Sequence, residues 1–312
     1  MITQKELADE LGVSVGTVSL ALSNSPLVNR ETAAKILELA RNRGYRRNNL
    51  GRALQAGHNR VIGCVVNTMT GSFFNEVIEG IGRTCASNGY GFMVAWGREN
   101  SALYVEQMLE NRVAGVIFAG YSQEFRTSAE FLRDAGLDIF FCSTHETPDF
   151  PHVVTNDIAG GSMALEYLYG NGHRDFLVEN YYPIRVKAAE SFLAQHPDCS
   201  CRFFTTPQEA LQLFKQQKAT AAICFSDEDA ICLLGVFRAA NLRIPEDISV
   251  VGYDNIRLCE FPGIELTTIG QQRENIGIKC AETAIACAEN RPYPRKILLE
   301  PELVERKTVK KC

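Results

Sequence analysis

The sequence predicts an α/β protein with a small all-α N-terminal domain and a larger core of two doubly wound α/β lobes. Two observations lead to this fold class. Residues 1–46 contain short segments with apolar residues at helical spacing, whereas from residue 61 onward short apolar runs alternate with amphipathic helical patterns. Such alternation is typical of parallel sheets with helices on both faces. So many strand–helix units in about 250 residues favour two lobes over one sheet.

The charge of the chain is divided unevenly. Residues 1–60 contain nine Lys or Arg against five acidic residues, a formal charge of +4. This leaves −9 on the remainder of a chain whose total is −5. A compact basic segment on an acidic body is expected when only that segment contacts a polyanion such as DNA.

The composition excludes several other classes of protein. The chain has 312 residues, 46% of them hydrophobic and 22% charged, which is enough for a substantial buried core. The first ten residues include Lys5, Glu6 and Asp9, and no apolar run approaches the length of about 18 residues that spans a membrane. We therefore expect a cytoplasmic protein with no membrane partner.

The eleven cysteines do not suggest a metal site. Their number is odd and their positions are scattered, and the spacing of the closest pair, Cys199 and Cys201, does not form a zinc knuckle. We expect reduced and mostly buried thiols, with no metal and no cofactor.

Capping residues mark the first two helices of the N-terminal domain. Thr3 and Glu6 form a predicted capping box, and Gly12 ends the helix that follows. Ser14 is placed to cap a second helix that runs to about Leu22.

A third helix and a polar linker follow. The pattern predicts a helix from Arg30 to Arg43, with Gly44 as the residue that ends it. The basic stretch Arg46–Arg60 is expected to be a linker with one weak helix at Asn48–Ala56. A helix this short is marginal alone, so we expect it to fold only when DNA and a partner copy support it.

The remainder of the chain contains the α/β elements. Predicted strands are Val61–Val66, Gly91–Ala95, Gly115–Ala119, Asp138–Cys142, Val153–Thr155, Phe176–Glu179, Cys201–Thr205, Ala221–Phe225 and Ser249–Tyr253. Predicted helices include Asn75–Ser87, Ala102–Asn111, Gly160–Asn171, Pro207–Gln217, Asp229–Asn241 and Arg273–Asn290.

The segment Leu7–Ser19 has the pattern of a helix-turn-helix. Two helices joined by a tight Gly-containing turn, with hydroxyl residues at the start of the second, suit insertion of that second helix into the major groove. Here the chain resembles the lactose-repressor (LacI/GalR) family. The matching residues are Val13-Ser14, Thr17-Val18-Ser19, Ala21-Leu22-Ser23-Asn24, Val28, Arg30-Glu31-Thr32 and Gly44-Tyr45. The extended motif and the +4 charge disfavour the alternative of a protein-binding helical hairpin.

The resemblance implies roles for individual residues. Val15, Gly16 and Leu20 occupy the family's main base-contacting positions, while Thr17 and Ser19 would hold phosphates or cap the helix. Because the three base-contacting residues lack polar groups, we expect apolar contacts, DNA shape and phosphate contacts to determine binding. The other expected DNA-binding residues of this domain are Thr3, Ser14, Asn24, Arg30 and Tyr45.

The linker resembles the family's hinge helix at Asn48, Arg52, Ala53 and Leu54. Leu54 is the candidate for the leucine that inserts into the minor groove at the centre of the operator, where an apolar wedge kinks DNA. The sequence departs from the family at two places. Arg47 stands where many relatives have proline, and Gly51 where alanine is usual.

The resemblance continues through the body of the chain and implies a periplasmic-binding-protein-like core. Its matching residues are Ser72-Phe73-Phe74, Asn156-Asp157, Gly160-Gly161, Gly172-His173-Arg174, Ile244 to Asp254, and Leu266-Thr267-Thr268-Ile269. The expected domains are a helix-turn-helix domain at 1–46, a hinge and linker at 47–60, and a core at 61–312. Within the core we expect an N-lobe of about 61–157 plus 272–290 and a C-lobe of about 158–271 plus 291–312.

The family binds its effector between the lobes, and polar and aromatic residues near strand ends are the candidates here. They are Ser72, Phe73, Phe74, Tyr121, Arg185, Ser226, Asp227, Asp254 and Gln271. Their chemistry suits a carbohydrate, because carboxylates and amides pair with hydroxyls and aromatic rings cover a sugar's apolar face.

Some of these assignments have alternatives. Phe73 and Phe74 equally suit helix-entry packing, and Asp227 equally suits a capping role. Asp254 is favoured as a ligand contact because it follows an apolar strand. Lys187 competes with Arg185, since the segment 179–201 departs from the family's register and is shortened.

Two other functions fit the sequence less well than a DNA-binding regulator. An enzyme is disfavoured because the sequence contains neither GxGxxG nor GxxxxGK[ST] and no cysteine or serine with a convincing neighbouring base. A transport or chemotaxis sugar-binding protein would lack the basic N-terminal domain. We expect a homodimer on double-stranded operator DNA, controlled by a small-molecule effector. The tail Glu305–Cys312 has no leucine heptad for a tetramerisation coil.

Overall fold

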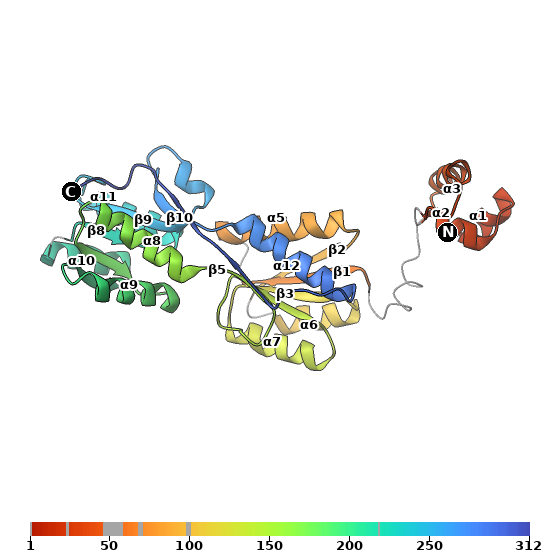
Figure 1. Cartoon of the computed structure of the whole chain (residues 1–312), viewed down its shortest axis with the longest axis horizontal. Coiled ribbons are helices and arrows are strands. Elements are labelled where there is room, and N and C mark those ends of the chain that lie inside the picture. Colours follow the sequence, from red (N-terminus) through yellow and green to blue (C-terminus); the bar gives the residue numbers. More distant parts are fainter. Residues whose placement is uncertain (1, 23–24, 46–58, 68–70, 98–100, 218) are drawn as a thin grey trace. The chain divides into compact units, whose positions relative to one another are not determined.

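The structure is a computed structural model that describes residues 2–22, 25–45, 59–67, 71–97, 101–217 and 219–312. The chain divides into two compact units, Met1–Asn59 and Arg60–Cys312 (Figure 1).

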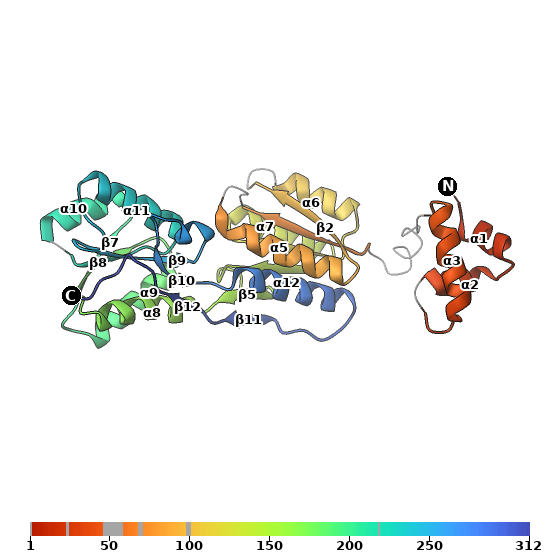
Figure 2. The ribbon, with the colours of Figure 1, turned by 90° about the horizontal axis from the view of Figure 1, so that it is seen from above.

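The N-terminal unit contains the three predicted helices, α1 (Gln4–Leu11), α2 (Val15–Leu22) and α3 (Arg30–Asn42) (Figure 2). The predicted capping box at Thr3 and Glu6 is present. Gly12 adopts a left-handed conformation with φ of 64° and ends α1. The helices enclose a small core whose buried members are Leu7, Ala8, Val18, Ala21, Ile36 and Ala40.

The first lobe of the C-terminal unit, the N-lobe, is a six-stranded sheet in the order β11-β5-β4-β3-β1-β2. All of its paired strands are parallel. The strands are β1 (Val61–Val66), β2 (Gly91–Trp96), β3 (Gly115–Ala119), β4 (Ile139–Cys142), β5 (His152–Thr155) and β11 (Lys296–Leu299). The helices are α5 (Ser72–Ser87), α6 (Ser101–Glu110), α7 (Gln123–Asp134) and α12 (Arg273–Ala288).

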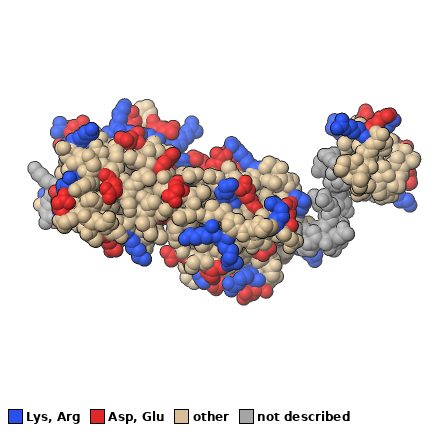
Figure 3. Space-filling view, viewed as in Figure 1, with Lys and Arg blue, Asp and Glu red and all other residues tan. Residues whose placement is uncertain are grey.

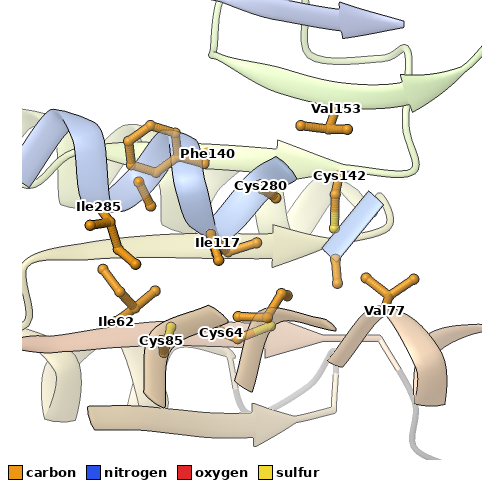
Figure 4. Packing of buried hydrophobic residues seen from close by; sticks show 14 of the residues in the cluster. Ile62, Cys64, Val77, Cys85, Ile117, Phe140, Cys142, Val153, Cys280 and Ile285 are labelled. Carbon is orange, nitrogen blue, oxygen red and sulfur yellow. The ribbon is translucent and has the colours of Figure 1, made fainter. Parts of the chain in front are cut away.

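Helices cover both faces of the N-lobe sheet. Helices α5 and α12 enclose one core cluster, which contains four buried cysteines: Cys64, Cys85, Cys142 and Cys280 (Figure 4). Burial raises the pKa of Cys64 and of Cys85, which suits structural thiols rather than reactive ones. Helices α6 and α7 cover the other face. All eleven cysteines are free and six are buried.

The second lobe, the C-lobe, is a six-stranded sheet in the order β12-β10-β9-β8-β6-β7, in which β12 is antiparallel. Its strands are β6 (Asp175–Glu179), β7 (Ser200–Phe204), β8 (Ala221–Ile223), β9 (Ser249–Asp254), β10 (Thr267–Gly270) and β12 (Glu302–Val304). Its helices are α8 (Asp157–Gly170), α9 (Pro183–Gln195), α10 (Pro207–Gln217), α11 (Asp227–Ala239) and the 3₁₀ helix η1 (Arg257–Glu260). Both lobes are doubly wound sheets, so the predicted fold class is confirmed.

The structure corrects one predicted boundary between the lobes. The segment 291–312 was assigned to the C-lobe, but β11 pairs in parallel with β5 of the N-lobe. Only after Glu300 and Pro301 does the chain enter the C-lobe as β12. The apolar residues of β11 complete the edge of the first sheet, beside β5, and this addition was not visible in the sequence pattern.

The predicted strands are present within a few residues of their expected ends, but β10, β11 and β12 were not predicted. Three helices begin earlier than expected, because polar residues start them. Helix α5 begins at Ser72, α8 at Asp157 and α11 at Asp227. These extra first turns lie at the carboxyl ends of the preceding strands, where parallel sheets form ligand sites.

Charged side chains are distributed over the molecule. Acidic and basic residues are interspersed over the face of the core shown in Figure 3.

Of the helices in the described part of the chain, none is long and apolar enough to cross a membrane. The same described residues contain no group of three or more His, Cys, Asp or Glu placed to hold a metal ion.

Candidate functional site

Helix α2 has one buried and one exposed face. Val18 and Ala21 are fully buried in the domain core. On the other face, Val15 is 45% exposed and Leu20 39% exposed. Val15 and Leu20 therefore offer an apolar surface that can contact an apolar partner such as the methyl groups of thymine.

The start of α2 is held by hydroxyl groups. The Ser14 hydroxyl accepts a hydrogen bond from the Thr17 backbone N–H at 3.0 Å and lies 2.9 Å from the Thr17 hydroxyl. Gly16 lies beside it, and a Cβ there would meet only the Ser14 hydroxyl at 3.6 Å. The open backbone at Gly16 allows close approach of a DNA backbone or base edge.

The remaining predicted DNA-binding residues differ in their surroundings. Thr3 is occupied locally, because its hydroxyl donates to the Glu6 carboxylate at 2.9 Å. Ser19 is partly buried on α2, Arg30 is exposed at the start of α3, and Tyr45 packs against the domain core. Four predicted residues lie outside the described part of the chain: Asn24, Asn48, Arg52 and Leu54.

Sequence reasoning missed one exposed residue of this domain. Leu27, in the loop between α2 and α3, is 81% exposed. Its position after Ser25 and Pro26 in a predicted loop was the available signal.

The core has a cavity of about 470 Å³ lined by residues of both lobes. This volume lies within the range of about 300–1,000 Å³ that is typical of small-molecule sites. The lining includes six of the nine predicted effector residues: Phe73, Phe74, Arg185, Ser226, Asp254 and Gln271. The structure thus brings most of the predicted candidates together from distant parts of the chain.

Three predicted effector residues do not line the cavity. Asp227 is fully buried and accepts hydrogen bonds from the Ile256 backbone N–H at 2.8 Å and from the Thr268 hydroxyl, so it fixes the loop after β9. The Tyr121 hydroxyl lies 3.4 Å from the Gln123 side chain. Ser72 contributes only its backbone N–H, which donates to the Glu228 carboxylate at 3.0 Å between the lobes.

Arg185, rather than Lys187, lines the cavity, and Lys187 is exposed. The guanidinium of Arg185 donates to the Asp157 carboxylate at 2.9 Å and to the Phe225 carbonyl. It also lies 3.6 Å from the ring centre of Tyr253, at a distance that favours a cation–π interaction. Burial lowers the pKa of Arg185, but Asp157, Tyr253 and Asp254 together outweigh it and the pKa is raised, so the guanidinium stays charged.

Asp157 is the matching anion of this pair. It begins α8, and its carboxylate accepts hydrogen bonds from the Tyr253 hydroxyl at 2.9 Å and lies 3.0 Å from His145 Nε2. Burial raises the pKa of Asp157, but Arg185 and the hydrogen-bond donors outweigh it and the pKa is lowered. The charges of Arg185 and Asp157 therefore neutralise each other within the cavity wall.

Asp254 and Gln271 connect β9 to the segment after β10. The Gln271 amide donates to the Asp254 carboxylate at 2.7 Å, and its oxygen accepts from the Thr155 hydroxyl. Asp254 has a φ of 119°, which is strained for a residue with a side chain. Burial raises the pKa of Asp254 well above its usual range, only partly opposed by Arg185. Strained backbone and a buried carboxylate are typical of functional sites.

The sequence analysis did not identify several lining residues. Among them are the acidic residues Asp157, Glu179, Glu228 and Asp229 and the tyrosines Tyr181 and Tyr182. Glu179 ends β6 just as Asp254 ends β9, so the rule that favoured Asp254 would also have found Glu179. No signal of that kind marks Tyr181 and Tyr182.

Sequence comparisons match both units. Residues 3–48 match the family model described as "Bacterial regulatory proteins, lacI family", and residues 165–309 match "Periplasmic binding protein-like domain". The chain is 28% identical to the HTH-type transcriptional repressor PurR of Vibrio cholerae, over 99% of this chain and 98% of that protein. It is 27% identical to PurR of Histophilus somni, over 99% of each.

Solved structures show the same fold. The Lac repressor dimer bound to operator and the anti-inducer ONPF matches with a TM-score of 0.80 at 21% identity, over 99% of each chain. The transcriptional regulator CelR in complex with cellobiose matches with a TM-score of 0.71 at 21% identity, over 99% of this chain and 100% of that one.

A helix-turn-helix domain with an exposed second helix, joined to a two-lobed core that encloses a ligand-sized cavity, defines a sequence-specific DNA-binding transcription regulator. The N-terminal domain matches the LacI family of bacterial regulatory proteins, and nearly the whole chain is similar to transcriptional repressors named PurR. The matched relatives are named as transcriptional repressors, which agrees with the prediction that this protein is a regulator and not an enzyme.

Proposed function

We propose that the protein represses transcription as a homodimer on a pseudo-palindromic operator, and that a small effector bound in the core cavity changes this binding. In this scheme residues 1–46 bind the major groove, residues 47–60 form the hinge, and residues 61–312 bind the effector and the partner copy. A regulator of this kind works in the cytoplasm, where it has access to the DNA.

The exposed apolar face of α2 supports the DNA-binding part of the proposal. Val15, Gly16 and Leu20 present no hydrogen-bonding side chain, so bidentate recognition of bases from these positions is excluded. Specificity would instead come from thymine methyl groups, from the shape of the DNA and from insertion of Leu54 into the minor groove.

The cavity carries the effector part of the proposal. Its lining combines Phe73 and Phe74 with the hydrogen-bonding groups of Arg185, Asp254 and Gln271. Aromatic rings beside paired donors and acceptors suit a polyhydroxylated molecule, such as a sugar or sugar derivative. The hydrogen bond from the Ser72 backbone to Glu228 joins the lobes at this cavity, so a bound molecule can change how the lobes are held together.

Selection of random DNA duplexes by the purified protein, followed by fluorescence-anisotropy titration at several salt concentrations, tests the DNA-binding part. We expect enrichment of one palindrome. Leu54→Ala is expected to weaken binding to it, whereas Leu298→Ala, at an exposed position on β11, should not. Weak, steeply salt-dependent binding without sequence preference that persists with every compound found to raise the protein's melting temperature would contradict the proposal.

The same operator then tests the effector part. A panel of sugars is screened for any compound that both raises the melting temperature of the protein and changes its operator affinity. A compound that does both identifies the effector class, and its loss of effect in Asp254→Asn would place it in the cavity. If operator affinity responds to no compound, sensing by this cavity is excluded.

A further inference from the structure

The cavity is strongly acidic. Its lining contains five carboxylic acids, Asp157, Glu179, Glu228, Asp229 and Asp254, and one basic residue, Arg185. Arg185 is already paired with Asp157. Burial raises the pKa of Asp254 well above its usual range, so this residue adds little charge, but the described lining residues include no lysine or histidine to balance Glu179, Glu228 and Asp229.

Glu179 and Asp229 form the centre of this negative charge. Glu179 lies at the end of β6 and is 5% exposed, and its carboxylate accepts a hydrogen bond from the Phe225 backbone N–H at 2.6 Å. Asp229 lies in the first turn of α11, where its carboxylate is bonded to the Ser226 hydroxyl. Phe225 and Ser226 are consecutive residues, so these two hydrogen bonds place the Glu179 and Asp229 carboxyl groups close together in the cavity wall.

Glu179 can lose its proton near neutral pH. Burial, together with the charge of Asp229, raises the pKa of Glu179 to about 7, opposed by its hydrogen bond to Phe225 and by Arg185. A positively charged group placed beside Glu179 and Asp229 would gain two carboxylate partners in a partly desolvated place, where such interactions are strong.

We infer that the cavity selects a ligand that carries a protonated nitrogen, such as an amino sugar, and binds that nitrogen at the Glu179–Asp229 pair. This inference rests on the proposed effector role of the cavity and specifies the chemistry of its ligand. A neutral polyol would satisfy the acceptor oxygens but leave the charge uncompensated. A phosphorylated sugar would add negative charge and be repelled.

The aromatic residues of the lining fit the same ligand. Phe73 and Phe74 pack edge to face with ring centres 5.1 Å apart, and Tyr181 and Tyr182 do so at 4.9 Å. All four line the cavity. Aromatic faces contact the apolar face of a sugar ring and also attract a cation.

Thermal unfolding of the full-length protein at pH 7 with matched sugars tests the inference. The probes are D-glucosamine, D-galactosamine and D-mannosamine, each against its parent sugar, with N-acetyl-D-glucosamine as the form that keeps the nitrogen but loses the charge. We expect at least one amino sugar to raise the melting temperature, with an affinity about tenfold or more above that of its parent sugar and its acetylated form. Glucose 6-phosphate should have no effect.

Two variants locate the nitrogen. Glu179→Gln keeps an oxygen for the Phe225 N–H, and Asp229→Asn keeps one for the Ser226 hydroxyl, so both retain the local hydrogen bonds while removing charge. Each should abolish the preference for the amino sugar. Glu190→Gln, at an exposed position on α9, is the control and should retain it. Operator binding by each variant shows that it is folded.

The outcomes separate this inference from the proposed function. If a neutral sugar shifts both the melting temperature and operator affinity and no amino sugar exceeds it, the effector role stands and the charge preference is wrong. Stabilisation by Mg²⁺ or Ca²⁺ alone, lost in Glu179→Gln, would make the pair a cation site and overturn the inference. If no amine shifts the melting temperature, the inference also fails.

Discussion

The two lobes of the core have the same strand order but contribute different chemistry to the cavity between them. The N-lobe supplies aromatic and small polar residues, such as Phe73, Phe74 and Ser143, and no charged side chain. Every charged residue of the lining comes from the C-lobe, including Glu179, Arg185 and Asp229. The shared fold therefore provides the cavity, whereas residues at the strand ends of one lobe determine its electrostatics.

A close helix–helix contact lies in the N-lobe, and a buried polar network lies in the C-lobe. In the N-lobe, α5 and α12 approach so closely that a Cβ on Gly277 would lie 2.0 Å from the Val77 carbonyl oxygen. In the C-lobe, Arg185, Asp157 and Tyr253 form a buried polar network beside the cavity. We expect the N-lobe to be sensitive to added volume and the C-lobe to the loss of one charge.

Arg185→Met tests the C-lobe side of this comparison and should have the largest effect. It leaves the Asp157 carboxylate buried without its cation, and breaking a buried pair in this way costs about 3–5 kcal/mol. Urea denaturation should report that loss in the free energy of unfolding. Lys187→Met, an exposed position on the same helix, is the control and should change it by less than about 0.5 kcal/mol. A similar small change for Arg185→Met would show that the network is not a stabilising feature of the C-lobe.

Glu179→Gln should alter the pH dependence of stability. The pKa of Glu179 is about 7 in the folded protein against an ordinary value of 4.5. A raised folded pKa means that the stabilisation from this group is present below about pH 4.5 and is lost as the pH rises through about 7. Gln cannot ionise, so the variant should gain about 3 kcal/mol relative to wild type between pH 4.5 and pH 8.

The measurement is the difference in the free energy of unfolding between the two proteins across this pH range. Glu190→Gln serves as the matched control and should show no pH-dependent difference. A constant difference between Glu179→Gln and wild type would mean that the Glu179 carboxylate is not destabilised by its surroundings.

Features that depend on residues close together in the sequence were predicted, and features that depend on contacts between distant segments were not. The capping box at Thr3 and the end of α1 at Gly12 depend on residues a few positions apart, and both were predicted. The strand β11 and the placement of Asp227 depend on contacts with distant segments, β5 and the loop after β9. Local patterns contain no record of those partners, so the lobe boundary at 291 was wrong, and the hydrogen bonds of Asp227 to Ile256 and Thr268 were not predicted.

The residues of the cavity were also predicted only in part. Candidates at the carboxyl ends of predicted strands, such as Asp254, were found because the geometry of parallel sheets is general. Glu179 could be found by the same rule, but its proximity to Asp229 joins the end of β6 to the start of α11, and only the fold brings these two residues to one cavity. The clustering of acidic residues in the cavity was therefore not predictable from the sequence.

Gly277→Ala tests the N-lobe side of the comparison. The added methyl group would collide with the backbone of α5, so the helices must separate, at a cost of about 1–3 kcal/mol. Gly235→Ala in α11 is the contrasting variant, because a Cβ there meets nothing within 4 Å. It should stabilise the protein by up to about 1 kcal/mol through helix propensity. Thermal and urea unfolding should show a lower free energy of unfolding for Gly277→Ala and a higher one for Gly235→Ala. Changes of the same sign in both variants would contradict the attribution of N-lobe stability to close helix packing.

Glu228→Gln should have the smallest effect and tests the contact between the lobes. Its carboxylate accepts a hydrogen bond from the Ser72 backbone N–H. Because Glu228 is exposed, water can replace this hydrogen bond where the variant weakens it. Gln keeps one acceptor oxygen, and we expect less than about 1 kcal/mol of change in stability. Because this bond joins the two lobes at the cavity, its weakening should instead appear as a few-fold change in effector affinity. A change in stability above that limit, with effector affinity unaltered, would mean that the contact supports the fold of one lobe and does not govern how the two lobes close on a ligand.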